Sequence, residues 1–277
     1  MMALKLMYIT NRPDIAQIAE SAGVDRIFVD LEYIDKNKRQ GGMDTVQSHH
    51  TLVDVENVRR AISSSDLLVR VNPIHESTKE YASSKEEIEA VIQAGADCIM
   101  LPYFKSVNEV ALFVDIVDGR VKIIPLVETP EAVADIEDIM RIDGVDELYI
   151  GLNDLSLGYG KKFMFELVED GTVERLADRF RENEIPFGFG GIAALGKGML
   201  PAEYVIKEHY RLGSSSVILS RSFLNVDKEK HFGVISKTFI QGVQEIRNLE
   251  AECARHRDYF EDNKQQMDSM IRKVSMA

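Results

Sequence analysis

The sequence predicts a (β/α)8 TIM barrel, and three observations lead to this fold class. Short apolar runs of the length of buried parallel strands recur along the chain, and a helix-like segment follows each of them. Eight such units fit one domain of the size common among α/β barrels, in a chain of 277 residues. No G-x-G-x-x-G motif follows the first apolar run, so an open dinucleotide-binding sheet loses its main support.

The expected strands share a high content of apolar and β-branched residues, which is typical of strands buried on both faces. In chain order they cover residues 4–9, 26–31, 66–71, 97–101, 121–127, 148–150, 186–189 and 215–219. The expected helices cover residues 13–22, 53–63, 83–94, 106–117, 172–183 and 202–210. One more helix is expected to begin after residue 127, with Thr129 as its N-cap and Pro130 at its first position.

The C-terminal region is longer than one closing helix requires. Residues 1–224 are predicted to form the barrel, and residues 225–277 a closing helix and a C-terminal helical extension. Residues 237–246 are amphipathic, and the segment that follows them is highly charged. A surplus helix of this kind can be a solvated tail or can pack on a neighbouring subunit, and the pattern leaves both open.

Composition excludes several classes of partner. A net charge of −13 argues against nucleic acid or an anionic membrane as the main partner. No apolar run approaches the length of a membrane span, and the N-terminal residues lack the apolar core of a signal peptide. The two cysteines lie far apart in unlike contexts, so we expect a cytoplasmic protein without redox chemistry.

The barrel places the active site at the C-terminal ends of the strands. The polar residues expected at those ends are Asn11, Arg12, Asp30, Glu32, Arg70, Asn72, Glu128, Asn153, Asp154, Ser220 and Arg221. Glu128 directly follows one apolar strand, and Asp154 follows the next strand after the turn Gly151-Leu152-Asn153. Two carboxylates at the same end of neighbouring strands can share a hard cation such as Mg²⁺. Arg70 ends another apolar strand directly, and this combination suits a metal with an anionic substrate.

Four motifs together resemble the HpcH/HpaI aldolase and citrate lyase β-subunit family. They are F-V-D-L-E at 28–32, V-R-V-N-P at 69–73, L-V-E-T-P-E-A at 126–132 and I-G-L-N-D-L-S at 150–156. The resemblance covers roughly residues 4–224 and implies a pyruvate- or phosphoenolpyruvate-type TIM barrel. It also implies a homo-oligomer, a trimer or hexamer, in which the C-terminal helices pack across subunits.

The resemblance also implies roles for particular residues. Glu128 and Asp154 would hold Mg²⁺ or another divalent ion such as Mn²⁺ or Co²⁺, and Arg70 would bind the carboxylate of a 2-oxo acid. The turn amides of Gly151, Leu152 and Asn153 would help to hold that acid. Cleavage of a carbon–carbon bond next to a carbonyl leaves an enolate, whose negative oxygen a divalent ion stabilises as a Lewis acid.

The chain departs from the family at one position. The aldolase branch has a histidine directly after the acidic pair on the second strand, and this chain has Tyr33 there. His49 and His50, in the long loop that follows, are therefore candidates for a substitute base, together with Asp30 and Glu32. Asp30 and Glu32 can equally pair with arginines at the barrel rim, and the general base stays open.

We therefore expect a metal-dependent carbon–carbon lyase that acts through a metal-bound enolate of pyruvate or a related 2-oxo acid, with an aldehyde as its partner. One alternative is a lyase acting on an acyl-CoA thioester, for which Lys36, Lys38 and Arg39 are candidate contacts to a CoA phosphate, although they are equally residues of a solvated loop. A further alternative is a non-catalytic binding protein on the same scaffold.

Overall fold

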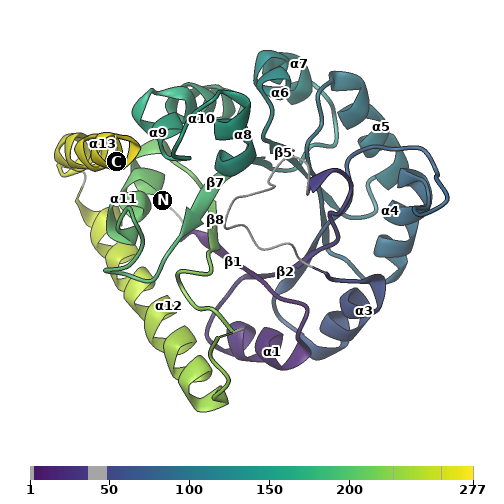
Figure 1. The fold of residues 1–277 in the computed structure, drawn as a ribbon, viewed down its shortest axis with the longest axis horizontal. Coiled ribbons are helices and arrows are strands. Elements are labelled where there is room, and N and C mark those ends of the chain that lie inside the picture. The colour runs from purple at the N-terminus through teal and green to yellow at the C-terminus, as the bar shows by residue number, and fades with distance from the viewer. Residues whose placement is uncertain (1–2, 37–48, 227, 257, 277) are drawn as a thin grey trace.

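Eight parallel strands form a closed barrel in the computed structural model, which describes residues 3–36, 49–226, 228–256 and 258–276 (Figure 1). Each strand pairs with the next one in the chain, and β1 pairs with β8 to close the barrel. The strands are β1 (Lys5–Ile9), β2 (Arg26–Asp30), β3 (Asp66–Arg70), β4 (Cys98–Leu101), β5 (Lys122–Val127), β6 (Leu148–Ile150), β7 (Phe187–Ile192) and β8 (Ser216–Leu219). The predicted TIM barrel is confirmed.

A ring of helices surrounds the barrel (Figure 1). The helices up to β6 are α1 (Pro13–Ser21), α3 (Leu52–Ala61), α4 (Ser84–Gln93), α5 (Val107–Val117), α6 (Pro130–Ala134) and α7 (Ile136–Met140). Those after β6 are α8 (Leu152–Gly158), α9 (Glu166–Glu169), α10 (Thr172–Glu182), α11 (Ala202–Leu212), α12 (Phe232–Arg255) and α13 (Phe260–Ser275).

Local sequence signals fix where several helices begin. Thr51 and Ser83 each form a capping box with the acidic residue three positions later, at the start of α3 and of α4. Thr129 accepts a hydrogen bond from the amide of Ala132, and Pro130 is the first residue of α6, as predicted. These caps explain why the sequence alone locates helix starts within one or two residues.

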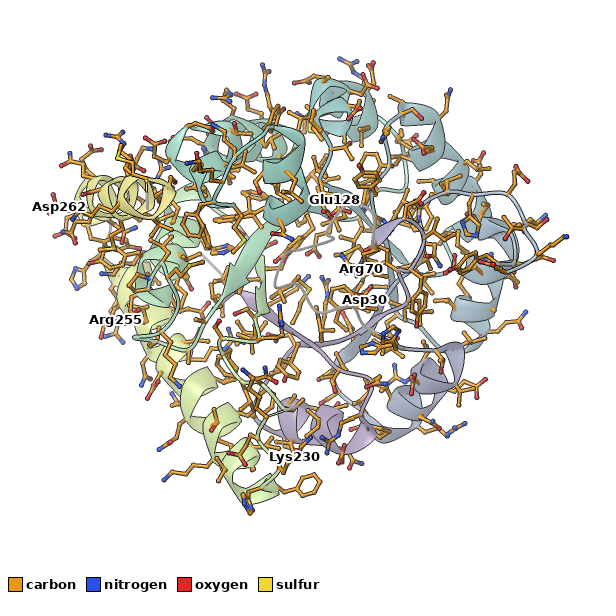
Figure 2. All side chains as sticks on the ribbon, viewed as in Figure 1. Asp30, Arg70, Glu128, Lys230, Arg255 and Asp262 are labelled. Atoms are coloured by element: carbon orange, nitrogen blue, oxygen red, sulfur yellow. The ribbon has the colours of Figure 1, made fainter. Side chains whose placement is uncertain are left out.

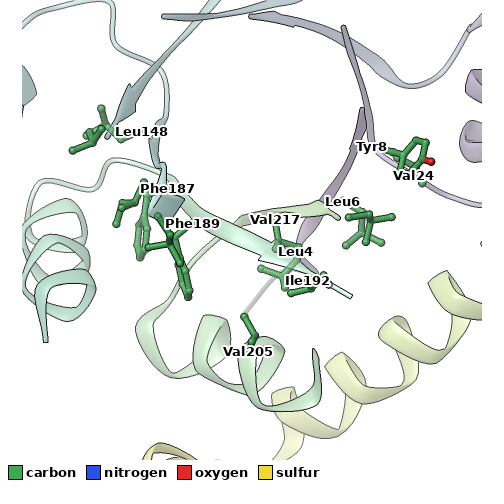
Figure 3. Close-up of a cluster of buried hydrophobic side chains, with 14 of the residues drawn as sticks. Leu4, Leu6, Tyr8, Val24, Leu148, Phe187, Phe189, Ile192, Val205 and Val217 are labelled. Carbon is green, nitrogen blue, oxygen red and sulfur yellow. The ribbon is translucent and has the colours of Figure 1, made fainter. Parts of the chain in front are cut away.

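The strands divide the apolar side chains into two cores. Residues that point outward, such as Leu6, Val217 and Phe187, pack between the strands and the helices (Figure 3). A smaller cluster fills the barrel interior, and its members are Met7, Phe28, Leu68, Cys98, Met100, Ile124, Leu126 and Tyr149. Because side chains of a strand alternate between its faces, both cores are built from the same strands. The inner cluster forms the floor of the cavity described below.

A buried ion pair lies at the N-terminal end of the strands. The two Nη atoms of Arg26 donate to the two carboxylate oxygens of Glu147, at 3.0 and 2.8 Å. Ser216 Oγ donates to the same carboxylate at 2.7 Å, and the Arg26 side chain is 1% exposed. This end of a TIM barrel serves stability, in contrast to the end that carries the site.

The strand β7 differs from the prediction. It was expected to end at Phe189, and it continues through Gly190 and Gly191 to Ile192. The pairing with β8 shifts its register between Gly188 and Gly191, and Gly190 has a φ of +56°, which favours glycine. The glycine pair is therefore a bulge within the strand and not its end.

Both C-terminal helices pack on the barrel of their own chain. The helix α12 contacts α1 and α11 and so closes the ring, while α13 contacts α11 and α9 (Figure 1). Ile235, Phe239 and Ile246 of α12 and Met267 and Ile271 of α13 are buried by this packing. Packing of the extension on a neighbouring subunit, and the trimer or hexamer, stay predictions. None of the helices in the described ranges is long and apolar enough to span a membrane.

Candidate functional site

A cavity of about 380 Å³ opens at the C-terminal ends of the strands. Its floor is formed by the inner-barrel side chains Phe28, Met100, Leu126 and Tyr149. Figure 2 shows Asp30, Arg70 and Glu128 directed towards this central region of the barrel. Of the predicted site residues, those that line the cavity are Asp30, His50, Arg70, Glu128, Gly151, Leu152, Asn153 and Asp154. Glu32 and His49 lie outside its lining.

The predicted metal ligands Glu128 and Asp154 both border this cavity and are 3% and 6% exposed. Glu128 follows the last residue of β5, and its Oε1 accepts a hydrogen bond from the amide of Tyr103 at 2.9 Å. Tyr103 has a left-handed φ of 47°, an uncommon conformation for a residue with a side chain. This backbone conformation accompanies the hydrogen bond that holds one oxygen of Glu128.

The other oxygen of Glu128 lies against Gly151. A methyl group added at Gly151 would come within 2.7 Å of Glu128 Oε2. Any residue other than glycine would therefore displace this oxygen. Gly151 is also the N-cap of α8, and the amide of Leu155 bonds to its carbonyl. The expected turn over Gly151-Leu152-Asn153 is therefore wrong, because the helix begins at Leu152 and Asp154 lies in its first turn. That the amides there hold an acid stays a prediction.

These two carboxylates fit the divalent ion that the family implies. Mg²⁺ is commonly bound by one or two protein carboxylates, with water and substrate oxygens completing its shell. Within the described part of the chain, no group of three or more histidine, cysteine, aspartate or glutamate side chains could hold a metal. Two carboxylates leave room in the coordination shell for substrate oxygens, whereas a closed structural zinc site takes four protein ligands.

Arg70 is held by a neighbouring carboxylate from β2. Its Nε and Nη2 donate to the two carboxylate oxygens of Asp30, at 2.8 and 2.7 Å. The strand register produces this contact, because Asp30 and Arg70 are paired Cα positions of β2 and β3. Burial alone would raise the pKa of Asp30, but the charges of Arg70 and Lys36 outweigh it and hold the pKa well below its usual range.

Lys36 completes a buried group of alternating charges. Its Nζ lies 2.7 Å from Asp30 and 3.3 Å from Glu32, and Arg70 Nε lies 3.4 Å from Glu32. Lys36 is only 5% exposed, which contradicts its interpretation as a solvated loop residue, and it lines the cavity, so its contact to a CoA phosphate stays a prediction. Burial is compensated here because two cations face two anions. Lys38 and Arg39 lie outside the described residues.

Arg70 keeps hydrogen-bonding capacity for a ligand. A guanidinium has five N–H donors, and the contact with Asp30 uses two of them on one edge. The guanidinium lies over the ring of Phe28, 5.6 Å from its centroid, and lines the cavity. Burial would lower the pKa of Arg70, but Asp30 and Glu32 raise it well above its usual value. Arg70 is thus a fixed, permanently charged group beside the cavity.

The two histidines of the loop have different environments. His50 is 9% exposed and lines the cavity, and its Nδ1 accepts a hydrogen bond from the backbone amide of Asp30 at 3.0 Å. His49 is exposed and stacks with Tyr33 at 6.4 Å between ring centroids. Tyr33, at the position of the family histidine, donates its hydroxyl proton to the backbone carbonyl of His50. The phenol therefore holds the backbone at His50.

Tyr149 is a cavity residue that sequence reasoning missed. Its hydroxyl donates to the carbonyl of Gly190 at 2.7 Å and accepts from the amide of Ile218 at 3.1 Å, so it joins β6, β7 and β8. Burial raises its pKa far above the usual value. In the sequence Tyr149 is one residue of an apolar run, and nothing there separates it from its neighbours.

Arg12 and Arg221, expected at strand ends, also line the cavity.

Comparison with known proteins gives the family. Residues 5–166, more than half of the chain, match the family model described as HpcH/HpaI aldolase/citrate lyase. A search of curated proteins found no match.

Two solved structures share the fold at low sequence identity. A HpcH/HpaI aldolase/citrate lyase family protein from Burkholderia cenocepacia J2315 is 17% identical, with a TM-score of 0.62, and the match covers 88% of this chain and 95% of that one. A HpcH/HpaI aldolase from Desulfitobacterium hafniense DCB-2 is 19% identical, with a TM-score of 0.57, and the match covers 88% and 93%. With the match to the family model, the chain belongs to the HpcH/HpaI aldolase/citrate lyase family.

Proposed function

We propose that the chain is a divalent-metal-dependent lyase that forms or cleaves a carbon–carbon bond through the enolate of pyruvate or a related 2-oxo acid. One observation carries the proposal: the buried carboxylates Glu128 and Asp154 and the fixed guanidinium of Arg70 line the same cavity. This combination provides ligands for a hard cation and a binding partner for a carboxylate. Membership of a family of aldolases and lyases supports the same reaction class.

Each residue has a distinct part in this reaction. The free edge of Arg70 binds the carboxylate of the 2-oxo acid, while Asp30 keeps the guanidinium from rotating. Glu128 and Asp154 would hold the divalent ion, and the chemistry it would supply when bound is Lewis-acid stabilisation of negative charge on the substrate oxygen. The floor of Phe28, Met100 and Leu126 keeps water away from the methyl or methylene carbon of the substrate.

Two of the acidic candidates are poorly arranged to act as a base. Asp30 accepts hydrogen bonds from both Arg70 and Lys36, and its lowered pKa makes its carboxylate a weak proton acceptor. Glu32 is 1% exposed, lies within the same group of charges and does not line the cavity. Both residues therefore serve to hold Arg70 and Lys36.

The acyl-CoA alternative gains no support from the described contacts. Of its three candidate contacts, Lys36 pairs with Asp30 and Glu32, and Lys38 and Arg39 lie outside the described residues. The aldehyde partner, the choice among Mg²⁺, Mn²⁺ and Co²⁺, and the non-catalytic alternative are left to experiment.

Exchange of the methyl protons of pyruvate in D₂O tests the proposal. Proton NMR would follow the methyl signal with Mg²⁺ or Mn²⁺ and with EDTA, for the wild type, Glu128→Gln and Asp154→Asn. Exposed Glu131, three residues after Glu128, provides the matched control Glu131→Gln. Electron paramagnetic resonance of Mn²⁺ would measure metal binding separately.

We expect metal-dependent exchange in the wild type and in Glu131→Gln, and loss of both exchange and tight Mn²⁺ binding in the other two variants. Mn²⁺ binding without any exchange would contradict the 2-oxo acid reaction and direct the search to acyl-CoA thioesters. The absence of both metal binding and exchange would favour the non-catalytic alternative.

A further inference from the structure

The ring of His50 has a defined orientation that determines which chemistry it can perform. A backbone amide can only donate a hydrogen bond, so Nδ1 of His50 must accept the one from Asp30 through its lone pair. In a neutral imidazole with an unprotonated Nδ1, the proton is on Nε2. The hydrogen bond from strand β2 thus fixes the tautomer of a histidine that lines the cavity.

The backbone around His50 is fixed as well. Tyr33 donates its hydroxyl proton to the carbonyl of His50, and Thr51, the next residue, is the N-cap of α3. Asn72 accepts hydrogen bonds from the amides of Tyr33 and Ile34, at 2.8 and 2.9 Å, so the segment with Tyr33 is itself held against the end of β3. Hydrogen bonds on its ring and on its backbone therefore fix the position of the imidazole.

The charges that face His50 do not make it an effective base. Burial lowers its pKa, and Lys36 and His49 act in the same direction, while the carboxylates of Asp30 and Asp54 oppose them. Protonation of Nδ1 would also break the hydrogen bond from the Asp30 amide. Nε2 already carries the proton of the neutral ring and cannot accept another.

We propose that His50 is a neutral Nε2–H hydrogen-bond donor to an oxygen of the bound 2-oxo acid, and that it is not the general base. The assignment rests on the proposed function for the identity of the ligand. Asp30 links the two substrate-facing groups, because its carboxylate holds Arg70 and its amide holds His50. Arg70 and His50 both line the cavity, so a single bound acid can contact both. A fixed donor costs no reorganisation when charge develops on the oxygen.

Nitrogen-15 NMR of the full chain, without substrate, tests the tautomer. The chain has six histidines, so the His50 signals are those that His50→Gln removes. We expect a protonated Nε2 and an unprotonated Nδ1 at about pH 6.5, where an ordinary histidine is half protonated. A proton on Nδ1, in either the other neutral tautomer or a cation, would overturn the inference and leave the proposed function untouched.

The pyruvate exchange assay tests the donor role. His50→Ala is expected to lower the exchange rate about 100-fold, the usual cost of one lost donor. His50→Gln, whose amide offers an N–H, should lose less, and the pH profile should keep its shape in both variants. His49→Gln is the matched control, because this adjacent residue is exposed and outside the cavity lining.

Three results would refute the donor role. One is wild-type exchange in His50→Ala, and another is loss of an acid limb of the pH profile in His50→Gln, which would identify a base. The third is the absence of pyruvate exchange in the wild-type protein, which would overturn the proposed function and the donor role together.

Discussion

Replacement of Gly151 by alanine adds one methyl group beside a proposed metal ligand. The φ of Gly151 is −82°, a value that alanine adopts without strain, so the effect comes from the side chain alone. The new carbon would lie 2.7 Å from Glu128 Oε2 and 2.8 Å from Glu128 Cβ, whereas ordinary contact begins at 3.4 Å. Glu128 must therefore shift by about 0.7 Å, or the start of α8 must move.

The size of the effect follows from this displacement. Overpacking of this kind usually costs about 1–3 kcal/mol of unfolding free energy. Misplacement of a reacting group by about 1 Å lowers activity about 100-fold, so we expect a loss of that order in pyruvate exchange. Weaker binding of Mn²⁺ should accompany it, because the same carboxylate is the proposed ligand.

Two control variants separate these effects. Gly158→Ala, in the same helix, would bring its methyl group within 2.7 Å of the Pro130 ring and tests overpacking that does not touch the Glu128 carboxylate. Gly233→Ala, in α12, meets no atom within 4 Å. Urea unfolding, Mn²⁺ titration and the exchange assay would be measured for all three. Wild-type metal binding and exchange in a folded Gly151→Ala protein would refute the assignment of Glu128 as a ligand.

Two further predictions concern stability. Glu147→Gln removes the nearer of two countercharges of the buried Arg26, because only Asp66, 3.6 Å from Nε, would remain. We expect a cost of about 3 kcal/mol in urea unfolding, the lower end for a broken buried pair. A loss below about 1 kcal/mol would contradict this. Glu20 accepts hydrogen bonds from the amides of residues 63–65, which outweigh its slight burial and lower its pKa to about 2. Since the folded pKa lies below the unfolded value of 4.5, this stabilisation is present above pH 4.5 and is lost as the pH falls towards 2. Glu20→Gln should therefore lose less unfolding free energy than the wild type over this pH range, and equal losses would show that these hydrogen bonds do not favour the charged form.

Local patterns along the sequence were enough to predict the barrel, the order of its elements and most of the residues at the strand ends. Apolar runs, helix caps and the residue that ends each strand are local signals, and each is determined by a few neighbouring residues. Asp30, Arg70 and Glu128 could be located at one end of the barrel because parallel strands carry their C-terminal residues to the same end.

The contacts among these groups arise only in the folded barrel. The register of β2 and β3 pairs Asp30 with Arg70, and the path of the chain after β2 returns Lys36 to the same carboxylate. Tyr33 and Asp30 contact His50 although they lie 17 and 20 residues before it in the chain. No local pattern in the sequence could therefore predict the tautomer of His50. Hydrogen bonds of about 3 Å depend on strand register and loop path, which the closure of the barrel fixes and a periodicity in the sequence does not.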